Sequence, residues 1–211
     1  QSDITQMSCT FVSGSSSGKS FLASRFLLEN ITTPRKRKVY VICANPKRDR
    51  PWLDFKKEYK KRGGDCILID AHDLIEEVPL DSLTPGCCLV VADEEVLDHG
   101  GVIQRLQRKA LIEGRKYSAP GVGGIVLFSV KHSLHNGAAS KWHATESSGF
   151  VLFTKSNQTL CRKILKSKLH FGKKMIDRII ELGGKGRYSW VYVRTGYAPT
   201  FVSSSSGIFL L

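Results

Sequence analysis

A run of small residues, Ser13-Gly14-Ser15-Ser16-Ser17-Gly18-Lys19-Ser20, constrains the fold of this chain more than any other feature. It follows a short β-type run, residues 7–12, and leads into residues 19–28, where apolar residues recur at near-helical spacing. Small residues let backbone N–H groups converge at the N-terminus of the next helix, where the helix dipole favours an anion. The run therefore predicts a strand, a loop and a helix, with phosphate bound at the loop.

The loop follows the P-loop pattern G-x-x-x-x-G-K-[ST], except that Ser13 stands in the place of the first glycine. In this pattern the lysine, here Lys19, bridges the β- and γ-phosphates, and the next hydroxyl, here Ser20, ligates Mg²⁺. A serine-rich turn before an ordinary helix is the alternative, but the apolar strand before it and the apolar helix after it favour a phosphate loop. The expected nucleotide contacts are Ser13, Gly14, Ser15, Ser16, Ser17, Gly18, Lys19 and Ser20.

A second motif is an apolar strand, residues 87–92, that runs directly into Asp93, Glu94 and Glu95. Taken alone it is a weak signal, because acidic residues at strand ends also serve as caps or as solvated groups. Downstream of a phosphate loop, such an aspartate holds the Mg²⁺ shell and the adjacent glutamate polarises the attacking water as general base. We therefore expect Asp93 on the metal side and Glu94 as the catalytic residue, with Glu95 as the alternative.

Apolar runs typical of buried strands alternate with helical patterns along the rest of the chain. The strand-like runs are residues 39–44, 66–69, 87–92, 125–128, 150–153 and 188–193. The helical patterns are residues 52–62, 101–113, 158–170 and 173–182. This order predicts an α/β fold with a mostly parallel central sheet and helices on both faces.

Length and composition add three expectations. The 211 residues suffice for one large domain, so we expect a single domain over 1–211 with a flexible serine-rich tail at about 203–211. No apolar run approaches the roughly 20 residues needed to span a bilayer, which predicts no membrane insertion. The six cysteines lie mostly in apolar runs without metal-ligand spacing, so we expect reduced core residues and an intracellular protein.

The charge balance is strongly basic. Lys and Arg number 32 against 19 Asp and Glu, a formal net charge of +13. Such a surplus favours a polyanionic partner, and nucleic acid is favoured over acidic lipid because there is no amphipathic anchor. The basic clusters lie at residues 35–38, 47–50, 56–57, 60–62 and 162–174. No base-reading motif accompanies them, so the expected contact is with a phosphate backbone of any sequence.

The phosphate loop and the acidic strand, with an inserted strand between them, resemble the RecA-like branch of P-loop ATPases. The absence of an N-K-x-D motif disfavours GTP. Residues 124–128, 134–141, 149–155 and 187–193 are similar to the core of the genome-packaging ATPases of the FtsK–HerA superfamily, which occur in Maverick/Polinton elements, virophages, poxvirus-like viruses and membrane-containing phages. The resemblance implies a RecA-like P-loop (ASCE) ATPase fold and an ATPase that uses ATP and Mg²⁺ to move double-stranded DNA into a viral capsid.

The same resemblance implies a homo-oligomeric ring, a pentamer or a hexamer, at a capsid vertex in the host cell during virion assembly. An arginine finger would reach the neighbouring subunit's site, and Arg115 lies where the family often carries an Arg-His pair, with Arg105 and Arg108 as alternatives. The family's γ-phosphate sensor is usually the Gln of a Thr-Gln strand end. Because this chain has Ser129-Val130-Lys131 there, the contact comes from Ser129, comes from Lys131 or is missing.

Two other function classes remain open at this point. A P-loop phosphotransferase would need a lid with several arginines and an acceptor pocket, and the acidic segment before Asp93 offers no clear lid. A non-catalytic, nucleotide-dependent DNA-binding or assembly protein would be compatible with Ser13 in the loop and with the missing sensor glutamine.

Overall fold

The structure is a computed structural model that describes residues 8–14, 17–92, 101–132, 143, 145–184, 186, 188–194, 201–204 and 207–210. Its contacts separate into two compact units. Unit 1 contains Ser8 and the described residues of 20–130, and unit 2 contains those of 9–19 and 131–211. The single domain expected over 1–211 therefore stays a prediction.

Unit 1 is built on a parallel sheet in the order β3-β2-β4-β5. Its strands are β2 (Val39–Cys43), β3 (Cys66–Asp70), β4 (Cys88–Ala92) and β5 (Val126–Lys131), whose last residue belongs to unit 2. Every residue of β2, β4 and β5 is buried. Strands covered on both faces have continuous apolar runs rather than alternating ones, which is why these strands could be located from the sequence.

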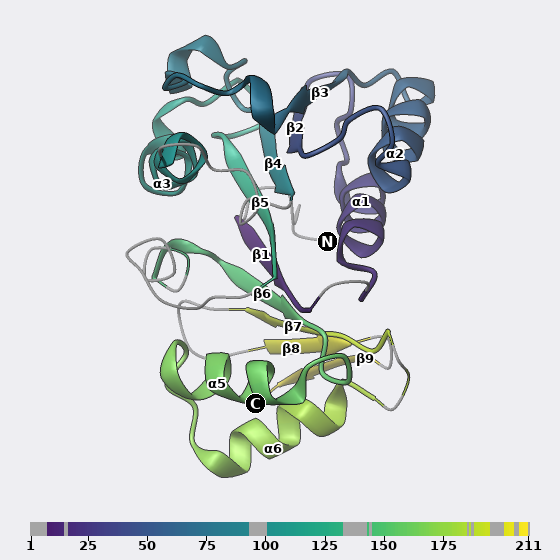
Figure 1. Ribbon diagram of the computed structural model, residues 1–211, viewed down its shortest axis with the longest axis vertical. Coiled ribbons are helices and arrows are strands. Elements are labelled where there is room, and N and C mark those ends of the chain that lie inside the picture. The colour runs from purple at the N-terminus through teal and green to yellow at the C-terminus, as the bar shows by residue number, and fades with distance from the viewer. Residues whose placement is uncertain are drawn as a thin grey trace. The chain divides into compact units, whose positions relative to one another are not determined.

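Helices cover both faces of this sheet: α1 (Lys19–Asn30), α2 (Arg50–Lys61) and α3 (Val102–Glu113). Leu127 of β5 belongs to a buried cluster that includes Ile103 and Leu106 of α3. The next residue, Phe128, meets Phe26 of α1, with ring centroids 6.2 Å apart. Successive strand residues point to opposite faces, so α1 and α3 lie on opposite sides, as Figure 1 shows.

Unit 2 has a mixed sheet in the order β1-β6-β7-β8-β9. Strands β1 and β6 are parallel, and the pairs from β6 to β9 are antiparallel. Two helices, α5 and α6, bury an apolar cluster against β1, β6 and β7, including Val12, Phe150 and Val193. The elements are β1 (Cys9–Val12), β6 (Gly149–Leu152), α5 (Gln158–Ser167), α6 (Lys173–Leu182), β7 (Val191–Arg194), β8 (Phe201–Ser204) and β9 (Gly207–Leu210).

The prediction of a flexible tail at about 203–211 is wrong for most of these residues. Ser203 and Ser204 lie in β8, and Gly207–Leu210 forms β9. Ser203 pairs with Tyr192 of β7 on one side and with Ile208 of β9 on the other. Serine-rich composition indicates a linker only when no partner strand is available. Residues 201–202 and 208–210 are also of types that favour strands.

The six cysteines are all free and buried, which confirms that they are core residues. Burial raises the pKa of the Cys66 and Cys161 thiols to about 12, so they stay protonated and weakly reactive. Among the residues that the structure describes, no helix combines the length and apolar character needed to cross a membrane.

Candidate phosphate-binding site

The loop after β1 is held at its first residue by two other segments of unit 2. The Ser13 N–H donates to the Lys131 carbonyl at 3.2 Å, and the Ser13 hydroxyl shares a hydrogen bond with the Ser156 hydroxyl. Among the described non-glycine residues only His170 has a positive φ, so Ser13 does not need the left-handed conformation that glycine provides. Serine therefore fits the first position of this loop.

Gly18, at the end of the loop, does require glycine. Its φ is +85°, in the left-handed region where a side chain strains the backbone. A Cβ added at Gly18 would also lie 3.4 Å from Cδ1 of the Tyr188 ring. The backbone therefore turns sharply at Gly18 into α1, which begins at Lys19.

The Lys19 side chain folds back onto the first two residues of the loop. Its side chain is 5% exposed, and its ammonium donates to the carbonyls of Ser13 at 2.9 Å and Gly14 at 2.7 Å. The Nδ1 atom of His132 lies 3.4 Å from the same Nζ. An ammonium has three N–H donors and no acceptor. Lys19 must therefore exchange at least one of these three contacts for a phosphate oxygen when an anion enters the loop.

Two buried serine hydroxyls add to the polar character of the predicted sites. Ser17 of the loop is 3% exposed, Ser129 of β5 is 0% exposed, and neither Oγ has a hydrogen-bond partner among the described residues. A buried polar group without a partner costs about 1–3 kcal/mol. Such a cost is expected where a bound ligand completes the hydrogen bonding.

Lys131, the other sensor candidate, is the last residue of β5 and is 5% exposed. Its charge acts on a buried polar group of unit 2, His143, whose pKa is held well below the ordinary value by burial and then by Lys131. The Nδ1 atom of His143 lies 3.1 Å from the Thr10 hydroxyl, which also lies 3.0 Å from the Ser147 hydroxyl. His143 is therefore a neutral residue that joins β1 to the segment before β6.

We expect this histidine to make the fold sensitive to acid. Because the folded pKa of His143 lies below the unfolded one, the unfolded chain binds the proton more readily, and stability falls as pH drops below about 6.5. The slope from this one group is at most about 1.4 kcal/mol per pH unit. Urea unfolding at several pH values should show it, and His143→Gln should have a shallower slope. Equal slopes in both proteins would contradict this account.

The described residues include only part of the predicted site. Ser15, Ser16, Asp93, Glu94 and Glu95 lie outside the described residues. Ser20 follows Lys19 in the first turn of α1 and is half-buried. His132, Ser156 and Tyr188 contact the loop and were not predicted. They come from distant parts of the chain, and no motif in the sequence marks them.

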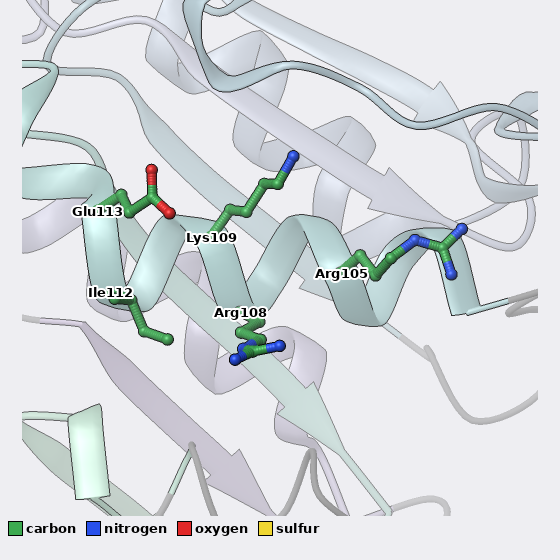
Figure 2. A pocket seen from close by; sticks show the side chains of 5 residues that line it. All are labelled: Arg105, Arg108, Lys109, Ile112 and Glu113. Atoms are coloured by element: carbon green, nitrogen blue, oxygen red, sulfur yellow. The ribbon is translucent and has the colours of Figure 1, made fainter.

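The three arginine candidates lie on the surface of unit 1. Arg115 is exposed in a short 3₁₀ turn, Gly114–Lys116, between α3 and β5. Arg105 and Arg108 are exposed residues of α3 and line a hollow of about 340 Å³. Figure 2 shows that Arg108 and Lys109 point in different directions from this helix. Lys109 forms an ion pair with Glu77, whose carboxylate also lies 4.0 Å from Arg105.

Comparison with known proteins identifies solved structures that share this fold. No family model matches the chain, and no curated protein matches it. The DNA-packaging ATPase B204 from Sulfolobus turreted icosahedral virus is 10% identical, with 93% of this chain and 96% of that chain covered and a TM-score of 0.60. The genome-packaging NTPase B204 from Sulfolobus turreted icosahedral virus 2, in complex with AMPPCP, is 9% identical, with 93% of this chain and 96% of that chain covered and a TM-score of 0.57. This likeness is one of fold, and it confirms the predicted α/β, RecA-like P-loop fold.

Proposed function

We propose that this chain is a Mg²⁺-dependent ATPase that translocates double-stranded DNA and packages a viral genome into its capsid. The nucleotide-binding part rests on one observation: the buried Lys19 ammonium donates to the carbonyls of Ser13 and Gly14, the first residues of a loop of small residues between β1 and α1. Loop N–H groups, the helix N-terminus and a lysine together form a positive site for a triphosphate. The fold that the chain shares with a DNA-packaging ATPase supports the same proposal.

The chain's own residues take the following roles in this proposal. Lys19 neutralises charge on the β- and γ-phosphates, and Glu94 orients and polarises the attacking water. Ser20 and Asp93 hold Mg²⁺, which when bound neutralises the developing charge. Their hydroxyl and carboxylate oxygens are the ligands that Mg²⁺ prefers. The buried Ser17 hydroxyl of the loop, which has no hydrogen-bond partner in the part of the chain that the structure describes, fits a polar ligand. Ser129 senses the γ-phosphate.

The proposed assembly is a homo-oligomeric ring at a capsid vertex, in the host cell during virion assembly. Arg115 reaches the site of the neighbouring subunit and stabilises the charge of the transition state. Its exposure in a surface turn supports a role outside its own subunit. Arginine fingers in characterised NTPases contribute about 10³–10⁵ in rate.

The DNA part rests on the distribution of charge. Helix α2 buries Trp52, Phe55 and Tyr59 and exposes basic residues on its other side. In unit 2, α5 and α6 also expose several lysines. The exposed lysines are Lys56, Lys57, Lys60 and Lys61 in α2, Lys163 and Lys166 in α5, and Lys173 and Lys174 in α6. Such rows contact phosphates by charge and release counterions, which suits a motor that binds any sequence.

We expect duplex DNA to stimulate ATP hydrolysis, and we expect the stimulation to fall steeply between about 50 and 200 mM salt. Steady-state hydrolysis should be measured with and without a random-sequence duplex, with heparin at equal charge as the control polyanion. A rate indifferent to duplex DNA would contradict the motor. Transfer of the γ-phosphate to an acceptor would favour a phosphotransferase, and nucleotide binding without turnover would favour a non-catalytic assembly protein.

A further inference from the structure

An exposed aromatic side chain lies beside the phosphate loop. Tyr188 is 60% exposed, and it precedes β7 in the segment that follows α6. Its ring carbons Cδ1 and Cε1 lie 3.4 and 3.8 Å from the position that a Cβ on Gly18 would occupy. One part of the ring therefore packs on the last loop residue before Lys19, while most of its surface faces solvent.

The backbone on both sides of this ring is constrained. Gly183 packs so closely on Thr154 that a Cβ there would lie 2.2 Å from Oγ1, and Gly184 turns the chain with a φ of +84°. The Ser189 N–H then donates to the Gly186 carbonyl at 3.0 Å. Because Thr154 follows β6, these contacts join the segment before β7 to the end of β6. Tyr188 is thus positioned by the fold and not only by its own contact with Gly18.

We propose that Tyr188 stacks on the purine base of a nucleotide whose phosphates are bound at Ser13–Ser20; this inference rests on the proposed nucleotide site. Lys19 determines where the phosphates bind, and the Tyr188 ring lies against Gly18, the residue just before Lys19. A nucleotide bound there must extend its ribose and base away from the loop. An exposed tyrosine ring offers the apolar, flat surface on which a base stacks.

Stacking on one ring has a defined selectivity. Every base has a π-face, so a ring alone does not read the hydrogen-bonding edge of the base. The larger area of a purine gains more from stacking than that of a pyrimidine. Tyr188 therefore contributes affinity for the base as such, with a preference for purine over pyrimidine nucleotides, and contributes nothing to the binding of the phosphates alone.

Phe21 provides a matched control. It is 61% exposed, close to the exposure of Tyr188, and lies one residue after Ser20 in α1. It lines a hollow of about 150 Å³ together with Pro51 and Phe55 of α2. Phe21→Ala therefore removes an equally exposed aromatic ring near the loop in sequence without removing the ring that packs on Gly18.

The experiment compares the binding of ATP, CTP and inorganic tripolyphosphate, each with Mg²⁺, to the wild-type chain and three variants by titration calorimetry. We expect Tyr188→Ala to weaken ATP binding about 10-fold and to leave tripolyphosphate binding within about twofold. Tyr188→Phe, which keeps the ring, should bind ATP as the wild type does. Phe21→Ala should bind all three ligands as the wild type does.

Each other outcome overturns one identified part of this account. If the wild type binds ATP no more tightly than tripolyphosphate, or if Tyr188→Ala binds ATP normally, the base is not stacked on Tyr188. If Phe21→Ala loses ATP affinity and Tyr188→Ala does not, the base lies on α1. Equal loss of ATP and tripolyphosphate in Tyr188→Ala assigns the ring to loop structure. If neither ligand binds the wild type, the proposed nucleotide site itself is wrong.

Discussion

Lys19→Ala is expected to lower kcat for ATP hydrolysis by at least about 100-fold, the size of effect seen when one charge-stabilising donor is removed from an active site. Lys19 carries the buried ammonium of the loop, and it holds the carbonyls of Ser13 and Gly14. Its loss removes the positive charge that the β- and γ-phosphates would meet and also loosens the loop. We therefore expect weaker ATP binding as well as slower turnover.

Steady-state phosphate release and ATP titration measure these two effects separately. Lys155→Ala is the matched control, because Lys155 is an exposed lysine of the same unit that follows β6. The control should hydrolyse ATP at the wild-type rate with an unchanged thermal unfolding midpoint, and Lys19→Ala should still unfold cooperatively. Wild-type turnover in Lys19→Ala would show that the loop is not part of the active site. The assignment of Ser13–Ser20 as nucleotide contacts would then be wrong.

Glu94→Gln is expected to lower kcat by about 10²–10⁴-fold, the usual contribution of a general base. The amide has nearly the shape of the carboxylate but cannot accept a proton from the attacking water. Binding of ATP should be retained, because Glu94 acts on the water and not on the nucleotide. The variant should therefore hold ATP without turning it over, which separates it from Lys19→Ala.

Single-turnover hydrolysis with labelled ATP, together with a filter-binding measurement, tests this separation. Glu95→Gln is the comparison, since the two acids are adjacent in the sequence. Loss of turnover in Glu95→Gln, with normal turnover in Glu94→Gln, would transfer the role of general base to the second acid. Full activity in both variants would mean that the strand ending at Ala92 does not supply the base.

Strands β2, β4 and β5 of unit 1 could be predicted from sequence because every one of their residues is buried. The run predicted at 39–44 is β2, Val39–Cys43, and the run at 87–92 is β4, Cys88–Ala92. Helix ends were harder to predict. The helix expected over 158–170 ends at Ser167, and His170 has a φ of 56°, which no helix continues through. No glycine or proline marks that end, so periodicity alone extended the helix too far.

The site was predictable only in its contiguous part. The pattern Ser13–Ser20 names the loop and Lys19, because one strand and one helix bring those residues together. Ser156 reaches the loop through the pairing of β1 with β6, and Tyr188 reaches it through the turn before β7. His132 reaches it because the Ser13 N–H donates to the carbonyl of the preceding residue, Lys131. A single sequence contains no record of that proximity. The tail was mispredicted for a related reason, since its serines become strand residues only when β7 is beside them.

The most direct test of the central claim is a crystal structure of the chain with Mg²⁺ and a non-hydrolysable ATP analogue. We predict the triphosphate within Ser13–Ser20, with the Lys19 ammonium donating to a phosphate oxygen in place of at least one of its contacts with the Ser13 carbonyl, the Gly14 carbonyl and His132 Nδ1. We also predict the Asp93 and Glu94 carboxylates facing the same metal ion. An analogue bound elsewhere, or a Lys19 ammonium that makes no contact with the phosphates of a bound nucleotide, would contradict the account.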